Sequence, residues 1–229
     1  MSRADFDSEP PYLFPEYRSN ALRGPKRELV RLPSEWFHEI PGPVFGRVPV
    51  RPEDSDLTRQ HRDEPLGERI IVTGRVLDAD GRAVPHTLVE VWQANAAGRY
   101  LDAGDDHPAP LDPNFTGAGR CITDSAGRYR FVTVKPGAYP WRNHLNAWRP
   151  AHVHFSLFGP QLPSRLVTQM YFPGDPLMPF DPILNSIPDQ RGRDLLVADL
   201  DLDETVPEWA LGYRWDIVLR GRGATPIES

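Results

Sequence analysis

Short apolar runs separated by turn residues fill the chain from about residue 68 onward, a pattern typical of strands. In the run 87–94, Val89 and Val91 would face one side of a strand and Glu90 and Trp92 the other, because successive side chains alternate. We expect strands at 70–77, 87–94, 121–124, 128–134, 152–158, 165–172 and 212–219. The first two are expected to pair as a hairpin, while 96–119 lacks periodicity and is a candidate functional loop.

Helical patterns are scarce along the chain. Only residues 193–202 suit a helix, because Leu195, Leu196 and Ala198 would form one apolar stripe. Many short strands, few helices and no internal repeat predict an all-β fold. We therefore expect a β-sandwich of mixed or Greek-key topology, with long loops, an extended N-terminal arm and at most one or two short helices.

Residues 1–65 differ from the rest of the chain. They are rich in Pro, Arg and Asp, and their short apolar words, such as Trp36-Phe37, are separated by polar residues. Isolated aromatic residues need a surface against which to bury. We therefore predict that 1–65 is an extended arm that packs on a catalytic β-sandwich domain, residues 66–229, and on a partner subunit.

Net charge and cysteine content limit which partners the protein could bind and in which compartment it would work. The 26 Lys and Arg residues against 32 Asp and Glu residues give a net charge of −6, which disfavours nucleic acid or an anionic membrane as the main partner. A single cysteine, Cys121, excludes an internal disulfide framework. The chain has no apolar run of about 18 residues and no leader-like start. We expect a cytoplasmic protein that does not enter a membrane.

The first candidate for chemistry is the pair His152 and His154. Residues two apart in a strand point to the same face, so the two imidazoles would lie side by side, as metal ligands do. Ordinary solvated sheets also contain such pairs. Upstream, two prolines make a rigid loop that would carry Tyr139 and Arg149 toward the histidines.

Two tyrosines, Tyr100 and Tyr139, follow strand-like runs where a site at one end of a sandwich would lie. A phenol with a pKa near 10 binds a metal at neutral pH only if the cation is strongly charged, which points to iron(III). With two neutral imidazoles and no thiolate, such a donor set suits a hard ion. The alternative is that both tyrosines are packing residues. Arg149 likewise suits either a surface salt bridge or a cation beside a developing anion, and Gln169 either a plain strand position or a pocket.

Several motifs together resemble those of the intradiol ring-cleaving dioxygenases, from about Pro15 to Gly221. They are Trp92-Gln93-Ala94-Asn95, Gly98-Arg99-Tyr100, Leu111-Asp112-Pro113-Asn114-Phe115, Lys135-Pro136-Gly137-Ala138-Tyr139-Pro140-Trp141-Arg142-Asn143 and Trp148-Arg149-Pro150-Ala151-His152-Val153-His154-Phe155.

The resemblance implies a non-haem iron(III) held by four residues, Tyr100, Tyr139, His152 and His154. Tyr139 matches the tyrosinate that leaves the metal when substrate binds, and Arg149 matches an arginine beside the substrate ring. The residues that match substrate-contacting positions are Tyr17, Trp141, Arg142, Gln169 and Ile183.

Within this family, the chain resembles the iron-bearing β-type chains of the branch that cleaves protocatechuate (3,4-dihydroxybenzoate). Dioxygen would supply both oxygen atoms, the product would be 3-carboxy-cis,cis-muconate, and the reaction would belong to aromatic catabolism. A homologous α-type chain would complete the pocket in an (αβ)n oligomer. The extended arm favours this branch over the catechol branch, whose N-terminal region is helical.

Two other readings stay open at this point. A non-enzymatic β-sandwich module for ligand binding would have the same fold but no need of iron. A zinc hydrolase would use His152 and His154, but it normally adds a third His or a carboxylate, and none is evident from the spacing.

Overall fold

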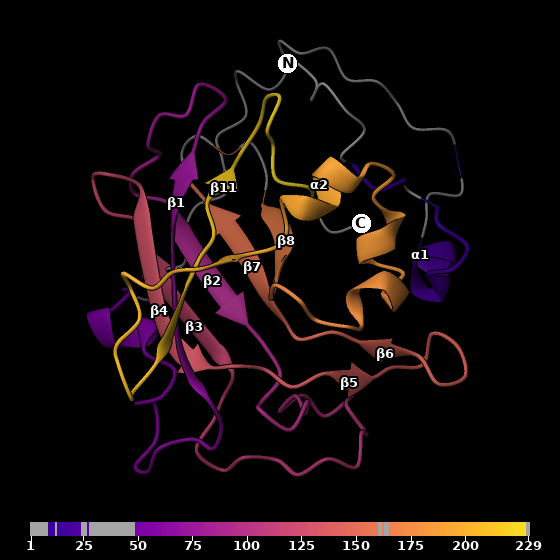
Figure 1. Cartoon of the computed structure of the whole chain (residues 1–229), viewed down its shortest axis with the longest axis horizontal. Coiled ribbons are helices and arrows are strands. Elements are labelled where there is room, and N and C mark those ends of the chain that lie inside the picture. Colours follow the sequence, from indigo (N-terminus) through magenta and orange to yellow (C-terminus); the bar gives the residue numbers. More distant parts are fainter. Residues whose placement is uncertain are drawn as a thin grey trace.

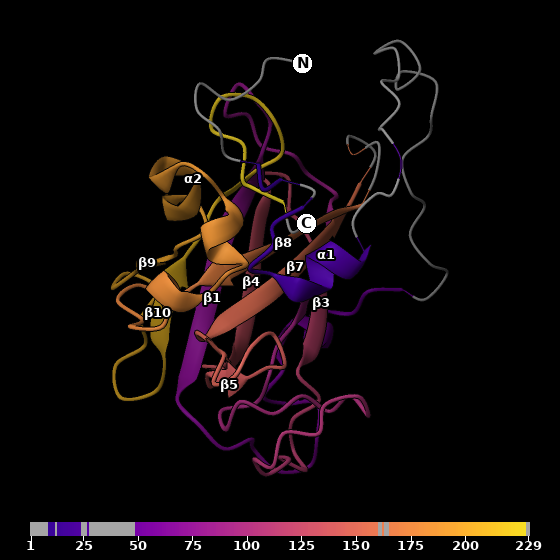
Figure 2. The same cartoon turned by 90° about the vertical axis from the view of Figure 1, so that its right-hand side faces the viewer.

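The computed structural model describes residues 9–11, 13–23, 27, 49–159, 162 and 165–227. Two sheets and a separate two-stranded ribbon make up its strands (Figures 1 and 2). The helical elements of the described residues are α1 (Arg18–Arg23), α2 (Gln190–Asp194) and the 3-10 turns η2 (Pro52–Ser55), η3 (Met178–Phe180) and η4 (Leu184–Ser186). The predicted all-β fold with few short helices is confirmed, and none of the described helices is long and apolar enough to span a membrane.

The first sheet is built around the long strand β1. Its strands are β1 (Arg69–Leu77), β4 (Arg128–Val134), β9 (Asp199–Leu200), β10 (Leu211–Arg214) and β11 (Ile217–Val218). Strand β4 pairs with β1 in antiparallel fashion, whereas β10 and then β11 pair in parallel with successive stretches of β1. The sheet is therefore mixed, as predicted.

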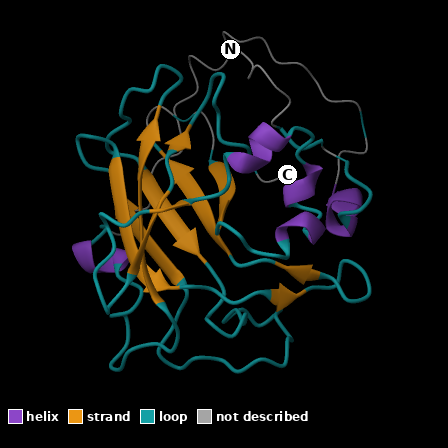
Figure 3. Cartoon of the chain, viewed as in Figure 1, coloured by secondary structure: helices purple, strands orange, loops and turns teal. Residues whose placement is uncertain are grey.

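The second sheet is antiparallel, with the order β3-β2-β7-β8. Its strands are β2 (Leu88–Trp92), β3 (Ala118–Ile122), β7 (His152–Phe158) and β8 (Leu166–Tyr171). The remaining ribbon pairs β5 (Tyr139–Pro140) with β6 (Trp148–Arg149). Figure 3 shows that most helical turns lie on the side of β8, away from β1 and β4.

The main core lies between the two sheets. Phe155 of β7 is fully buried and packs edge-on against Tyr129 and Phe131 of β4, with ring centroids 5.6 and 6.3 Å apart, and against Trp215, 4.9 Å away. Aromatic pairs in this geometry stabilise a core beyond the area that they bury. Leu57, which the sequence assigns to the arm, is fully buried in the same core, while the boundary at residue 65 stays a prediction.

The predicted hairpin between 70–77 and 87–94 is wrong, because the two strands belong to different sheets. The turn after β1 does fold back, with Gly81 donating to the Asp78 carbonyl and an isolated bridge between Leu77 and Ala83. The chain then crosses to the second sheet, where β2 pairs with β3 and β7.

The predicted helix at 193–202 is also wrong in position, since α2 ends at Asp194. After a turn at residues 195–196, Val197 forms an isolated bridge with Tyr171, which exchanges two backbone hydrogen bonds with Leu196 and Ala198. The apolar residues predicted to form a helix face therefore lie along the edge of β8.

The predicted terminal strand, 212–219, is interrupted between β10 and β11. The carbonyl oxygen of Trp215 fills the space beside Gly74, where a Cβ would lie 1.8 Å from it. Asp216 then accepts from the backbone and the guanidinium of Arg75, at 2.9 and 2.8 Å. A side chain thus replaces one backbone partner of β1 at this break.

Candidate active site

Strand β7 has two chemically different faces. Val153, Phe155 and Leu157 point into the core, so His152 and His154 share the opposite face. The antiparallel register places His154 between Trp92 of β2 and Gln169 of β8. The predicted side-by-side placement of the two imidazoles is present, with ring centroids 4.9 Å apart.

The loop that carries Tyr100 is shaped by Asn95 at the end of β2. Its side-chain oxygen accepts from the backbone of Ala97 and Arg99, both at 2.9 Å, and its carbonyl accepts from Gly98 and Gly137, both at 3.0 Å. An Asn side chain that bonds nearby backbone in this way fixes a turn. Because one carbonyl serves both loops, Asn95 ties the Tyr100 loop to the loop that leads to Tyr139.

The β5–β6 ribbon sets the other two groups. Its register places Tyr139 opposite Arg149, and Pro150 then leads directly into β7. The Tyr139 hydroxyl lies 3.3 Å from His152 Nε2, and its ring packs edge-on against Tyr100 with centroids 5.3 Å apart. The four predicted iron ligands are thus brought together from three separate segments.

The protonation of His152 suits metal binding. Its Nδ1 lies 2.7 Å from the Pro150 carbonyl, so Nδ1 carries the proton and Nε2 presents a lone pair. Burial, followed by the charge of Arg149 and by His154, holds the pKa of His152 well below its usual value. His152 is therefore a neutral donor, and a set of two imidazoles and two phenols without thiolate fits a hard trivalent cation such as iron(III).

Arg149 is buried and forms an ion pair with Asp181, at 2.9 Å between Nη2 and Oδ2. Burial disfavours the charged guanidinium, but Asp181, followed by Tyr171 and Tyr139, outweighs this and raises the pKa of Arg149 well above its usual value. Nη1 donates to His152 Nε2 at 2.9 Å and lies 3.5 Å from the Tyr139 hydroxyl. The arginine is therefore charged and directed at the centre of the cluster.

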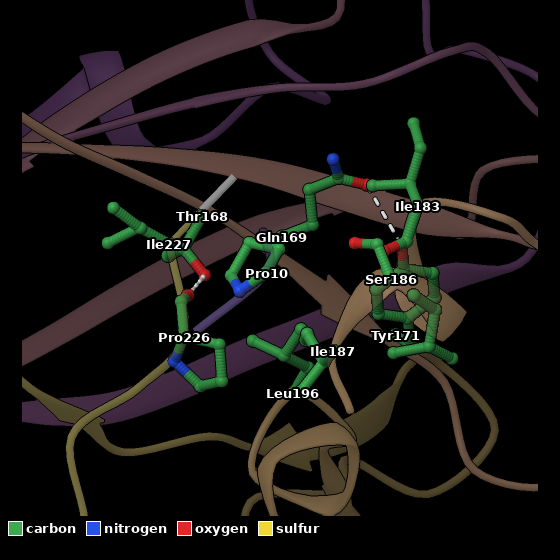
Figure 4. A pocket seen from close by; sticks show the side chains of 11 residues that line it. Pro10, Thr168, Gln169, Tyr171, Ile183, Ser186, Ile187, Leu196, Pro226 and Ile227 are labelled. Atoms are coloured by element: carbon green, nitrogen blue, oxygen red, sulfur yellow. Dashed lines mark hydrogen bonds between the residues drawn. The ribbon is translucent and has the colours of Figure 1, made fainter. Parts of the chain in front are cut away.

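Of the five predicted substrate-contacting residues, Gln169 and Trp141 lie beside Arg149. Gln169 accepts from Arg149 Nη2 at 2.5 Å, and the Trp141 ring lies 5.9 Å from the guanidinium carbon. Tyr17 is buried against Trp141, with ring centroids 5.5 Å apart. Ile183 and Gln169 both line a small pocket (Figure 4). Among the described atoms, Gln169 Nε2 and Trp141 Nε1 are buried donors without an acceptor.

The structure does not bring Arg142 to the cluster. Its side chain is 85% exposed and forms an ion pair with Asp106, which is also exposed. The role predicted for Arg142 remains a prediction.

Three neighbours of the site were not singled out from the sequence: Asp181, Tyr171 and, as a site residue, Trp92. Asp181 is a lone charge in the apolar stretch Met178-Pro179-Phe180-Asp181-Pro182-Ile183-Leu184, and that pattern is a signal of a buried ion pair. Trp92 stacks on His154, with centroids 4.8 Å apart and planes 1° from parallel. No sequence pattern predicts this pairing, because it depends on the register between β2 and β7.

The zinc reading lacks a third ligand. Among the described residues, no group of three or more His, Cys, Asp or Glu side chains is placed to hold a metal ion. A metal at this site would need the tyrosines.

Comparison with known proteins identifies the family of this chain. A family model described as Dioxygenase matches residues 40–221, and one described as Protocatechuate 3,4-dioxygenase beta subunit N terminal matches residues 2–35. The chain is 59% identical to the protocatechuate 3,4-dioxygenase β chain of Burkholderia cepacia, over 100% of this chain and 97% of the relative. This chain belongs to the intradiol dioxygenase family. The resemblance and the enzymatic class inferred from the motifs are confirmed.

More distant intradiol dioxygenases are also similar. The protocatechuate 3,4-dioxygenase α chain of Pseudomonas putida is 33% identical over 73% of this chain and 79% of its own length. The solved structure of 3-chlorocatechol 1,2-dioxygenase from Rhodococcus opacus 1CP superposes with a TM-score of 0.56 at 24% identity, covering 81% of this chain and 75% of that chain. This last likeness concerns the fold alone.

Proposed function

We propose that this chain is the catalytic β chain of a heteromeric enzyme that cleaves protocatechuate between its two hydroxylated carbons. Dioxygen supplies both added oxygen atoms, and 3-carboxy-cis,cis-muconate is the product. The observation that carries the proposal is the convergence of Tyr100, Tyr139, His152 and His154 on one face of the second sheet, in a chain with full-length β-chain similarity.

These four residues would hold a non-haem iron(III), which when bound draws electron density from a catechol ring and so makes it reactive toward dioxygen. Of the two tyrosines, Tyr139 would be the one whose phenolate oxygen accepts a proton from a substrate hydroxyl and gives up its place to the substrate oxygen. Tyr100 stays in place. This exchange would replace one negative charge by another, so it would not change the net charge of the buried site.

Arg149 would stabilise negative charge that develops on the substrate ring. In the structure its Nη1 donates to the lone pair of His152 Nε2, the same lone pair that a metal ion would use. With that lone pair engaged by a metal ion, Nη1 would be free to face the ring, where a fixed cation would stabilise developing negative charge. Gln169 and Trp141 offer their buried N–H groups to substrate oxygen atoms.

The partner would be a homologous α chain, since α chains of two such enzymes are also similar to this chain. Apolar side chains that remain exposed near the site agree with a missing neighbour, among them Leu145, Trp148 and Phe180. Tyr17 of the arm is buried against Trp141 of the same chain, and most of residues 24–48 lie outside the described part of the chain.

The test is product analysis under ¹⁸O₂. The iron-loaded chain, purified together with its α chain, should convert protocatechuate to 3-carboxy-cis,cis-muconate carrying two labelled oxygen atoms. The chain without α should be poorly soluble or weakly active. A different product, a single labelled atom or full activity of the isolated chain would each contradict part of the proposal.

A further inference from the structure

The Arg149 guanidinium is held along one edge by three side chains. The two N–H groups of Nη2 are shared among three acceptors, the Asp181 carboxylate and the Tyr171 hydroxyl, both 2.9 Å away, and Gln169 Oε1, 2.5 Å away. Nε points to the other carboxylate oxygen of Asp181, 3.4 Å away. Only Nη1 is left facing His152 and Tyr139.

We propose that Asp181 is a positioning residue for ring cleavage, which acts by fixing the orientation and balancing the charge of Arg149. This inference rests on the proposed function. Asp181 does not face the ligand cluster itself, and its side chain is 0% exposed.

Orientation follows from geometry. A carboxylate that meets both Nε and Nη2 of an arginine fixes the plane of the guanidinium, because the two planar groups match. The Tyr171 hydroxyl adds to this, since Asp181 Oδ2 lies 2.9 Å from it as well. With Nε and Nη2 engaged, the plane of the guanidinium directs Nη1 toward the reacting ring.

Charge balance follows from burial. An arginine that is 3% exposed would be costly without a counter-charge, and Asp181 makes the pair nearly neutral. The net charge at the ligand cluster is then set by the iron, its ligands and the substrate, while Nη1 still supplies a strong hydrogen-bond donor. Asp181 also accepts from the backbone of Ile183 at 3.1 Å, so the same carboxylate anchors a wall of the pocket.

The substitution that separates these roles is Asp181→Asn. Asparagine keeps an oxygen for the Ile183 N–H but replaces the second carboxylate oxygen by donors, which oppose Arg149 Nη2 and remove the counter-charge. We expect kcat for protocatechuate to fall by on the order of 10 to 100-fold, with iron content and KM within about twofold of the wild type.

A double-mutant cycle tests whether Asp181 acts through Arg149. In an Arg149→Ala background, Asp181→Asn should change kcat by less than about twofold, because nothing remains for it to position. An equal loss in both backgrounds, or an unchanged kcat in the wild-type background, would overturn the proposal. Asp189→Asn makes the same chemical change at the start of α2, away from Arg149, and should leave kcat unchanged.

Two further experiments test the proposal if Asp181→Asn does not fold or is inactive. If Asp181→Asn does not fold, Tyr171→Phe, which removes one hydroxyl from the same clamp, should lower kcat several-fold only when Arg149 is present. ¹⁵N NMR of the Arg149 side chain needs no activity: its Nε–H signal should lose protection in Asp181→Asn and keep it in Asp189→Asn. A wild type that cannot cleave protocatechuate would overturn the proposed function, whereas unchanged Arg149 signals in Asp181→Asn would overturn the placement itself.

Discussion

A Cβ atom on Gly137 would lie 2.6 Å from the backbone nitrogen of Gly98, so the two glycines mark a point where two loops touch through their backbones alone. One loop carries Tyr100 and the other leads to Tyr139. The reciprocal position is equally tight, because a Cβ on Gly98 would lie 2.2 Å from the Ala138 carbonyl oxygen. The contact between the loops brings the two tyrosine rings together.

Gly137→Ala should push the loops apart and weaken metal binding. Overpacking of this kind typically costs about 1 to 3 kcal/mol, and here the strain falls on the two tyrosine-bearing loops. Urea unfolding and the iron content after dialysis measure the two effects. Gly223→Ala is the matched control, since a Cβ there meets nothing within 4 Å. Equal iron content and equal stability in both variants would show that the contact between the two loops tolerates an added Cβ atom.

Trp92→Leu should loosen His154, because the indole stacks on the imidazole with the two planes 1° from parallel. Groups that orient a metal-ligating histidine typically affect metal affinity by about 10 to 100-fold, so iron should be lost faster to a chelator. Trp92→Phe retains a stacked ring and should lose iron at nearly the wild-type rate. Similar rates for the leucine and phenylalanine variants would mean that the stack has no role in orienting His154.

Arg142→Ala tests how the substrate carboxylate is recognised. If Arg142 turns from Asp106 to the carboxylate, its loss should lower kcat/KM for protocatechuate by on the order of 10 to 100-fold, the worth of about 1.5 to 3 kcal/mol, with little change for catechol. Asp106→Asn, which releases Arg142 from its ion pair, should not weaken protocatechuate turnover. Equal losses for both substrates would assign Arg142 to loop structure and leave carboxylate recognition to Tyr17 or the α chain.

Cys121 should be chemically inert and should make folding sensitive to alkaline pH. Burial raises the pKa of its thiol to about 12 from an ordinary 9.0. The unfolded chain therefore loses this proton first, and stability should fall as pH rises from 9 toward 12, by up to about 1.4 kcal/mol per pH unit. Cys121→Ala should lack this component of the decline in a series of urea unfolding curves. Identical slopes in the two proteins would mean that the thiol ionises equally well when folded.

Local patterns predicted the strands better than their partners. Alternation located β1, β2, β4, β7 and β8 to within a few residues, because it reports which faces are buried. Strand pairing depends on segments far apart in the sequence. Because β1 pairs with β4 and β10, the turn signal at Gly81 did not show that the next strand belongs to the other sheet. The apolar residues at 195–198 suited a helix, but in the structure their backbone forms hydrogen bonds with Tyr171 at the edge of β8.

The same distinction applies to the site. The His152 and His154 pair follows from strand geometry, and the tyrosines came from motifs resembling a known family. Asp181 was missed, since its partner Arg149 is 32 positions away and only folding joins them. The exposed position of Arg142 was equally hidden, because it depends on the ion pair with Asp106.

The central claim is that Tyr100 and Tyr139 bind iron(III) as phenolates beside the two histidines, and the visible spectrum of the purified enzyme tests it most directly. The account predicts a red-brown protein with a broad phenolate-to-iron charge-transfer band that weakens in Tyr100→Phe and shifts when protocatechuate is added without oxygen. A colourless protein that contains stoichiometric zinc, or a band unchanged in Tyr100→Phe and Tyr139→Phe alike, would contradict it.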